Sequence, residues 1–534
     1  MKSYHKHLES TLAAGETVSL TRRPVFRSSA IFPVLHTPQY SSRVLFMGYW
    51  LLKRRIPEVQ LLITLRDEEG AILLRRSLLI TEPKAFNLRV GDLLAETPLG
   101  ISSPDFTGSL ELEIFATRDL VYPYPAFVLN YYGDEFMASV HTTGRVYNDI
   151  EDLRENEDKL VPECGFDILS ADAYAPFFAF VNGVYAYDNQ RIGWTIVDEQ
   201  NKVHHGEFFL PPVPAYATRF VRLRDYIDLT AVLGGGKGTI KLHHGFRGFF
   251  PRFVAGNFEL RRPAISITHT YYDSSAVADA GAYWGNTDER FHDSAVFAPL
   301  FLDRGEYTHL VFYPIYSPSA FDISLEFYDE AGQCVVTLPK LRHLDLHDTP
   351  DQFFTLRFDE IIAAHFPADQ AQKLRGVNII KHWPNRTQIP TRLKFGLNVG
   401  RRGRAVDLPT NVCFNSQIAN AKVLTKPGTF KWSPVLDGDH SVVVILNGAA
   451  VKQYATPAHL RLTFYREADS QLLEREAQLL PFGQLRLEIN DDPVLREFLG
   501  GQPGWVTIQA DNPFVTAWYF DFNDSGAVGG DHAF

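Results

Sequence analysis

Two sequence landmarks recur four times along this chain. The first is a turn that carries a glutamate, found at Glu68, Glu199, Glu330 and Glu467. The second is a Leu-Arg pair downstream of each turn, at Leu88-Arg89, Leu223-Arg224, Leu356-Arg357 and Leu485-Arg486. Both landmarks keep a step of roughly 130 residues, and a fixed period predicts a chain built from repeated structural units.

The sequence around each turn alternates between apolar and polar residues. In the stretch FDISLEFYDEAG, Ile323, Leu325 and Phe327 fall on one face at the strand period of two. This pattern predicts a half-buried antiparallel strand that enters the acidic turn. A second strand, the Leu-Arg strand and a strand led by glycine follow in each unit, so we expect an all-β fold of four tandem β-sandwich repeats.

Helical patterns are scarce and fall between the Leu-Arg strand and the strand led by glycine. The best candidates are residues 358 to 375 and 492 to 500, which we expect to form short crossover helices. Polar stretches at 148 to 165 and 274 to 294 mark the clearest boundaries between units. The predicted domains are therefore residues 20–150, 166–275, 293–418 and 428–534.

Charge and composition exclude several classes of protein. The net charge of −11 argues against a binder of nucleic acid or of anionic membranes. No apolar run approaches the roughly 18 residues of a transmembrane helix, and the N-terminal residues lack the apolar core of a signal peptide. Three scattered cysteines, Cys164, Cys334 and Cys413, are too few for a disulfide framework. We expect a cytoplasmic protein, with non-classical export as the alternative.

The acidic turns and the recurring arginines each have a structural and a functional interpretation. Aspartate, glutamate and glycine are the residues that a tight hairpin prefers, so the turns are interpreted as structural. Arginine does not favour turns, and its planar fork suits carboxylates. Four arginines therefore either brace a neighbouring acidic turn or form a site for an anionic ligand or partner: Arg89, Arg224, Arg357 and Arg486.

A histidine recurs near the end of three units, at His141, His269 and His532, and Asn411 takes this place in the third unit. His141 and His269 have tyrosine and aspartate nearby in the sequence and are the candidate acid/base residues. The alternative is a role in the fold. This structural role is favoured because Asn411 replaces the histidine in the third unit, and an amide can replace an imidazole in a hydrogen bond but not in proton transfer.

The stretch RHLDLHD is the candidate metal site. His343, Asp345 and His347 share one face of an extended segment, and two imidazoles with a carboxylate suit a divalent metal such as zinc. No other cofactor is expected.

The sequence contains none of the common catalytic motifs, because the loop around Lys237 lacks the spacing of a phosphate-binding loop and no nucleophile elbow or HExxH pair occurs. Aromatic residues make up 13% of the chain, and tyrosine and tryptophan suit both sugar rings and protein partners. We therefore expect a non-enzymatic binding or scaffold protein that recognises a carbohydrate, a cell-surface polymer or a protein partner. Two alternatives are a glycan-active enzyme with a His/Asp or metal site, and a structural subunit that assembles into homo-oligomers.

Overall fold

The computed structural model describes residues 24–97, 105–141, 144–149, 152, 163–271, 283–314, 317, 319–346, 348–390, 394–415, 421–448 and 456–534. The predicted boundaries at 20, 150, 275 and 418 lie outside these residues, as does His347. The described chain consists mostly of antiparallel β-strands, which agrees with the all-β prediction. Its principal strands fall into four successive groups, which we call segments one to four.

Within the described residues, each segment contains eight principal strands. Those of segment one are β1(Arg27–His36), β2(Tyr40–Met47), β3(Val59–Asp67), β4(Ile72–Ile80), β5(Ala85–Arg89), β6(Phe106–Phe115), β7(Val128–Gly133) and β8(Phe136–His141). Those of segment two are β10(Glu163–Leu169), β11(Tyr174–Val181), β12(Gln190–Asp198), β13(Val203–Leu210), β14(Thr218–Arg222), β15(Lys237–His244), β17(Val254–Glu259) and β18(Ala264–His269).

The other two segments follow the same plan. Segment three contains β20(Ser294–Pro299), β21(Glu306–Phe312), β22(Phe321–Asp329), β23(Cys334–Leu344), β24(Phe354–Arg357), β25(Leu374–His382), β27(Lys394–Arg401) and β28(Thr410–Asn415). Segment four contains β29(Thr429–Val435), β30(Ser441–Asn447), β31(Ala458–Tyr465), β32(Leu472–Leu479), β33(Gln484–Glu488), β34(Gly504–Ala510), β35(Val515–Phe522) and β36(Val528–His532). Two further pairs of short strands are β9(Arg145–Val146) with β16(Phe249–Phe250), and β19(Tyr283–Trp284) with β26(Ile389–Pro390).

The strands of every segment form two sheets. Sheet one has the order first, sixth, third and fourth strand, as in β10-β15-β12-β13. Sheet two has the order fifth, second, seventh and eighth strand, as in β14-β11-β17-β18. In segment one the two sheets are joined through a single pairing of β1 with β2.

Short helices follow the fifth strand in all four segments. The predicted crossover helices at 358 to 375 and 492 to 500 correspond to α6(Phe358–His365), α7(Ala368–Ala371) and α8(Pro493–Leu499). The remaining helices are α2(Tyr49–Lys53), α3(Val90–Ala95), α5(Leu229–Leu233), η1(Leu223–Asp225) and η3(Ala421–Thr425). The Leu-Arg pair was predicted on a strand, and this is wrong in segment two. There β14 ends at Arg222, and the pair begins the 3-10 turn η1.

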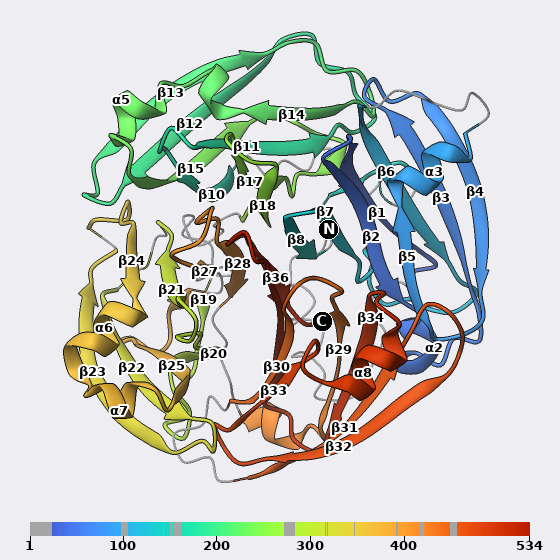
Figure 1. The fold of residues 1–534 in the computed structure, drawn as a ribbon. Helices are drawn as coiled ribbons and strands as arrows, with labels where there is room; N and C mark the ends of the chain where they lie inside the picture. Colours follow the sequence, from blue (N-terminus) through green and yellow to red (C-terminus); the bar gives the residue numbers. More distant parts are fainter. Residues whose placement is uncertain are drawn as a thin grey trace.

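The four segments are arranged in a ring (Figure 1). Their eighth strands, β8, β18, β28 and β36, lie around the centre, and each contacts the next in the order β8, β18, β28, β36 and back to β8. The fourth strands, β4, β13, β23 and β32, are the outer edges of their sheets. Segment four therefore contacts segment one, and the chain closes on itself.

Sheet two of each segment is buried on both faces. On β30, Val443 and Ile445 belong to the core of segment four, whereas Val442 and Val444 join the core of segment three. The same alternation occurs on β2, where Val44 faces its own segment and residues Leu45 and Met47 join the core of segment four. These second strands differ from the half-buried strands predicted to enter the acidic turns, because the preceding segment covers the face that would otherwise meet water.

The acidic turns also touch a neighbour. The Glu68 carbonyl accepts a hydrogen bond of 2.8 Å from Thr218 N, and the Glu330 carbonyl accepts one of 3.1 Å from Gln484 N. In the turn of segment two, Asn201 Oδ1 accepts one of 2.8 Å from Phe353 N. Gly332 has φ +86°, and a Cβ there would lie 2.1 Å from the Pro481 carbonyl. Each of these turns is thus fitted to the segment that follows it.

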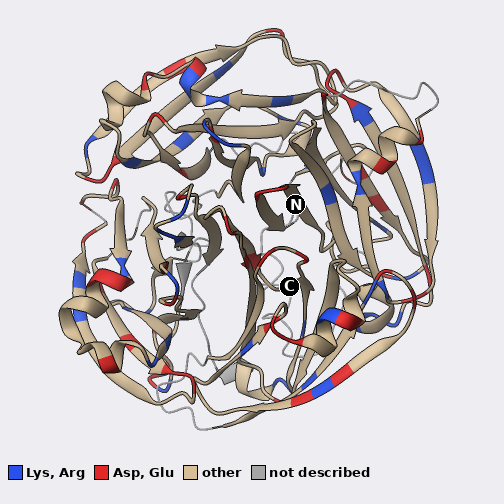
Figure 2. Ribbon diagram, in the orientation of Figure 1, with Lys and Arg blue, Asp and Glu red and all other residues tan. Residues whose placement is uncertain are grey.

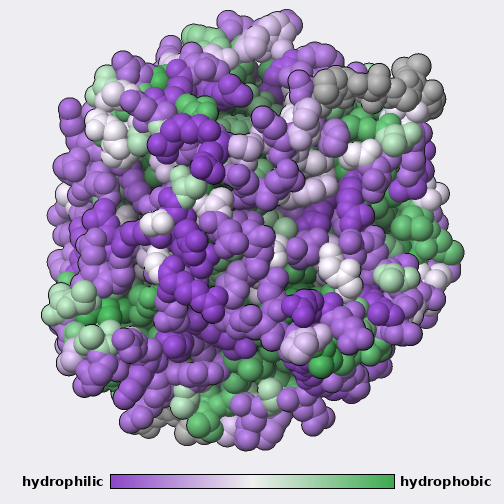
Figure 3. Space-filling model, viewed as in Figure 1, coloured by the Kyte–Doolittle hydropathy of each residue, from purple (hydrophilic) through white to green (hydrophobic). Residues whose placement is uncertain are grey.

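Charged side chains gather on the rim of the ring. Figure 2 shows acidic and basic bands on outer strands such as β32, while the strands near the centre are largely uncharged. The face in Figure 3 is mostly hydrophilic, with a hydrophobic patch over β4 at its right-hand edge. Among the described residues, no helix is both long and apolar enough to span a membrane.

One ion pair at the contact between segments four and one is nearly enclosed. The buried Arg43 on β2 donates to both oxygens of Asp437, at 2.5 and 3.0 Å, and to Asn130 Oδ1 at 2.6 Å. Removing one partner of a buried pair leaves an uncompensated charge in a region of low dielectric. This pair therefore contributes to ring closure.

We expect Asp437→Ala to lower the free energy of unfolding by about 3–5 kcal/mol, because it leaves the Arg43 guanidinium buried without a carboxylate. Urea denaturation followed by circular dichroism measures the loss. Glu474→Ala is the matched control, since it breaks the exposed Arg461–Glu474 pair and should change stability little. Equal losses in the two variants would contradict a role of Arg43 and Asp437 in closing the ring.

A second buried carboxyl group predicts how stability depends on pH. Asp521 on β35 is fully buried, accepts a hydrogen bond of 2.7 Å from Ser441 Oγ, and burial raises its pKa to about 7. Because this pKa is raised on folding, the folded state retains the proton up to about pH 7, whereas the unfolded chain loses it near pH 4. The contribution of Asp521 is therefore fully present at low pH and is lost as the pH rises through about 7.

We expect Asp521→Asn to reduce the decline in stability between pH 5 and pH 8. A single group of this kind changes the free energy of unfolding by at most about 1.4 kcal/mol per pH unit. Thermal unfolding of both proteins across this range measures the difference. Parallel pH profiles would show that Asp521 is ionised in the folded protein at pH 5.

Candidate functional site

The recurring histidines meet at the centre of the ring. His141 is the last residue of β8, His269 the last of β18 and His532 the last of β36. The His141 ring centroid lies 4.6 Å from that of His269 and 4.6 Å from that of His532. Residues from three segments are therefore in direct contact, and we call His141, His269, Asp531 and His532 the central cluster.

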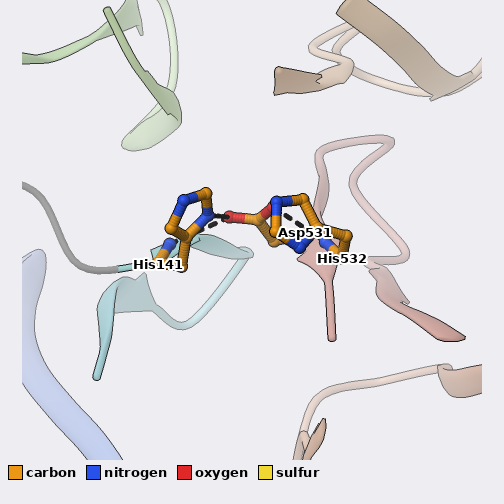
Figure 4. A group of neighbouring side chains, drawn as sticks. All are labelled: His141, Asp531 and His532. Carbon is orange, nitrogen blue, oxygen red and sulfur yellow. Dashed lines mark hydrogen bonds and ion pairs between the residues drawn. The ribbon is translucent and has the colours of Figure 1, made fainter. Parts of the chain in front are cut away.

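Asp531 of segment four contacts His141 of segment one within this cluster (Figure 4). Its Oδ2 accepts hydrogen bonds of 2.9 Å from both the backbone N and Nδ1 of His141. Its Oδ1 lies 4.0 Å from Nε2 of His532. The sequence placed this aspartate directly before His532, but the prediction considered only the histidine. The adjacent acid in GGDHAF was the available signal.

The electrostatics of the cluster favour a carboxylate at Asp531 and a neutral imidazole at His532. Burial raises the pKa of Asp531, but the hydrogen bonds and charge of His141 outweigh burial and hold the pKa below its usual range. Burial lowers the pKa of His532 to about 4. His532 is therefore neutral near pH 7, although about a third of its side chain remains exposed.

Backbone carbonyls fix the orientation of two of the imidazoles. The Ala533 carbonyl lies 3.1 Å from His532 Nδ1, and the Thr270 carbonyl lies 2.9 Å from His269 Nδ1. A carbonyl only accepts, so each Nδ1 must donate and each Nε2 carries the lone pair. This arrangement is typical of histidines that bind metals.

The third segment contributes an amide network instead of a histidine. Asn411 on β28 donates to Asn398 Oδ1 at 2.5 Å and accepts from the Tyr313 hydroxyl at 3.0 Å. Thr268 Oγ1 also approaches Asn411 Oδ1, at 3.5 Å. The network extends to the Asp167 carboxyl group, which accepts from Asn398 Nδ2 at 3.4 Å, so this side of the centre is polar.

The central cluster also contains the one convergent group of metal-ligating side chains found among the described residues. Ligand atoms of His141, Asp531 and His532 all lie within 4.8 Å of one another. The predicted metal residues lie elsewhere, on and after β23. His343 Nδ1 is hydrogen-bonded to Asp322 Oδ1 at 2.8 Å with its side chain 67% exposed, and Asp345 accepts a hydrogen bond of 3.4 Å from Asp348 N. Since His347 lies outside the described residues, the full predicted triad remains a prediction.

Three of the four recurring arginines reach the preceding segment in the ring. Arg89 donates to Gln502 Oε1 of segment four at 2.5 Å, and Arg486 donates to the Leu300 carbonyl of segment three. Arg357 lies 3.4 Å from Glu199 of segment two. Arg224 differs, since it donates only to carbonyls of its own segment: Tyr174, Ser170 and Ala171.

A groove of about 350 Å³ opens where Arg357 reaches segment two, and it is lined by Glu199, Gln200, Arg342, Phe354, Thr355 and Arg357. The guanidinium carbon of Arg342 lies 3.8 Å from the centre of the Phe354 ring. Burial lowers the pKa of Arg342, and no carboxylate pairs with it among the described residues. Thr355 Oγ1 is buried and lacks a hydrogen-bond partner there as well. Sequence reasoning missed Arg342 because no pattern in the sequence indicates that its side chain stacks on Phe354 of the next strand.

Comparison with known proteins adds no assignment: no protein family model and no curated protein sequence matches this chain.

The His141–Asp531 contact gives a direct test of a structural role for the histidine. We expect His141→Asn to retain most of the stability of the metal-free protein, because the Asn amide can donate to Asp531 from nearly the position of Nδ1. His141→Ala removes this donor from a buried carboxylate and should cost about 1–3 kcal/mol. Thermal and urea unfolding in EDTA measure both values. If Asn and Ala are equally destabilising, the hydrogen bond is not what His141 contributes.

Proposed function

We propose that this chain is a non-enzymatic binding protein for an acidic carbohydrate, in which four repeats of one β-sandwich unit form a rigid framework. The identical strand order of the four segments supports the repeat. The single observation that carries the ligand assignment is Arg342, which is stacked on Phe354 in a surface groove without a carboxylate partner among the described residues.

The groove combines the groups that an acidic sugar needs. A half-buried guanidinium has lost part of its hydration, so a carboxylate or sulfate of a ligand would compensate it. Glu199, Gln200 and Thr355 line the same groove and offer partners for sugar hydroxyls. The second guanidinium, from Arg357, already interacts with Glu199. One arginine is thus available for the anionic group, while the remaining polar groups suit neutral hydroxyls.

The position of the groove also favours binding. Its two walls come from different segments, since Glu199 and Gln200 follow β12 while Phe354 and Thr355 lie on β24. The hydrogen bond from Phe353 N to Asn201 fixes these walls to each other. A preorganised groove loses little conformational entropy on binding.

We further propose that the protein works in a reducing compartment such as the cytoplasm. The chain has only three cysteines, of which Cys164 and Cys413 are buried and Cys334 is exposed, and such sparse cysteines fit a location where thiols stay reduced. The ligand would then be an acidic glycan or glycan precursor present in that compartment.

We expect Arg342→Ala to weaken binding of a uronic-acid oligosaccharide by about 10- to 100-fold, because it removes the charged donor. Arg342→Lys should recover only part of the affinity, since the ammonium lacks the planar fork and its stacking. A glycan array identifies the oligosaccharide, and isothermal titration calorimetry measures both variants.

Arg461→Ala is the matched control, because Arg461 is an exposed arginine of segment four that pairs with Glu474. It should leave the affinity unchanged. Equal binding of the acidic oligosaccharide and its neutral counterpart, or full binding by Arg342→Ala, would contradict the proposal.

A further inference from the structure

The strands that carry His141 and Asp531 come from the first and the last segment of the ring. β8 closes segment one and β36 is the last strand of segment four, and the two strands contact each other at the centre of the ring. A Cβ at Gly529 on β36 would lie 2.1 Å from the Met137 carbonyl of β8, so only glycine permits this approach. The approach brings Asp531 and His532 beside His141.

The donor set of the central cluster matches that of a transition-metal site. Imidazole nitrogen and carboxylate oxygen are the usual zinc ligands besides thiolate. The hydrogen bond between His532 Nδ1 and the Ala533 carbonyl leaves Nε2 as the ligand atom. Metal-binding histidines are commonly oriented by a carbonyl in this way.

The distances are close to those that an ion would impose. Bonds of roughly 2.0–2.1 Å in a tetrahedral site place ligand atoms about 3.3 Å apart. The His141 Nδ1 to Asp531 Oδ2 distance is 2.9 Å, and the His532 Nε2 to Asp531 Oδ1 distance is 4.0 Å. With one ligand atom taken from each residue, all three atoms lie within 4.8 Å of one another, so each pair must approach by at most about 1.5 Å to reach the spacing around a bound ion.

We propose that His141, Asp531 and His532 bind one divalent transition-metal ion, with zinc as the best match, which joins segment one to segment four at the centre of the ring. The fourth position is taken by water or by His269, whose ring lies 4.6 Å from His141. The exposed third of His532 gives the ion a route from solvent. The metal has a structural role in this assignment, because it connects the last segment of the ring to the first.

The test uses the full-length protein, freed of metal with EDTA and then titrated with Zn²⁺ or Co²⁺. We expect one ion per chain by calorimetry and elemental analysis, visible absorption from tetrahedral Co²⁺, and a melting temperature that rises with the metal because the ion binds the folded state. Absence of a one-to-one complex at micromolar metal would overturn the proposal.

Two variants locate the ion. His532→Ala keeps the His141–Asp531 hydrogen bond, so it should fold, but it should lower the affinity for Co²⁺ at least 100-fold and abolish the rise in melting temperature. His343→Ala removes the exposed histidine of the originally predicted site and should leave both values unchanged. If His343→Ala abolishes binding while His532→Ala retains it, the ion belongs to the stretch around β23 and the central assignment is wrong.

Discussion

Sheet two of each segment depends on the preceding segment to cover its second face. Alternate residues of a strand point to opposite sides, so Val443 and Val444 on β30 contribute to two different cores. An isolated segment would expose one of these apolar faces to water, at a cost of roughly 25 cal/mol for each Å². Each segment therefore covers sheet two of the segment that follows it, and segment four must cover sheet two of segment one. Buried contacts such as that of Arg43 with Asp437 occur where segment four covers segment one.

The architecture was largely predictable, but the arrangement of its parts was not. The acidic turns, the alternating residues of β22 and the helices α6 and α8 are local features, and local patterns in the sequence indicate them. Continuous apolar runs such as VVVIL on β30 also carried the signal for strands buried on both faces. The Leu223-Arg224 pair shows the limit of local reasoning, because one residue decides whether it ends a strand or begins a turn.

The central cluster illustrates why a site between segments escapes sequence reasoning. The histidines were recognised as a recurring feature, and a role in the fold was favoured for them. Nothing in the spacing of His141, His269 and His532 indicates that they meet, because their contact follows from ring closure. Arg342 and Phe354 were missed for a related reason, since their stacking depends on the pairing of β23 and β24 with different neighbours in their two sheets.

Closure also sets how such a chain can change during evolution. An open array of repeats can gain or lose a unit, because each unit contacts only its neighbours and the ends carry capping surfaces. Here the Arg466 carbonyl, in the turn of segment four, accepts a hydrogen bond from Ala85 N of segment one, so segment four is already joined to segment one. Duplication of a fifth segment would separate these partners and require a different curvature at every junction. The number of segments is therefore constrained by geometry, and diversification is restricted to loops and side chains of a ring of fixed size.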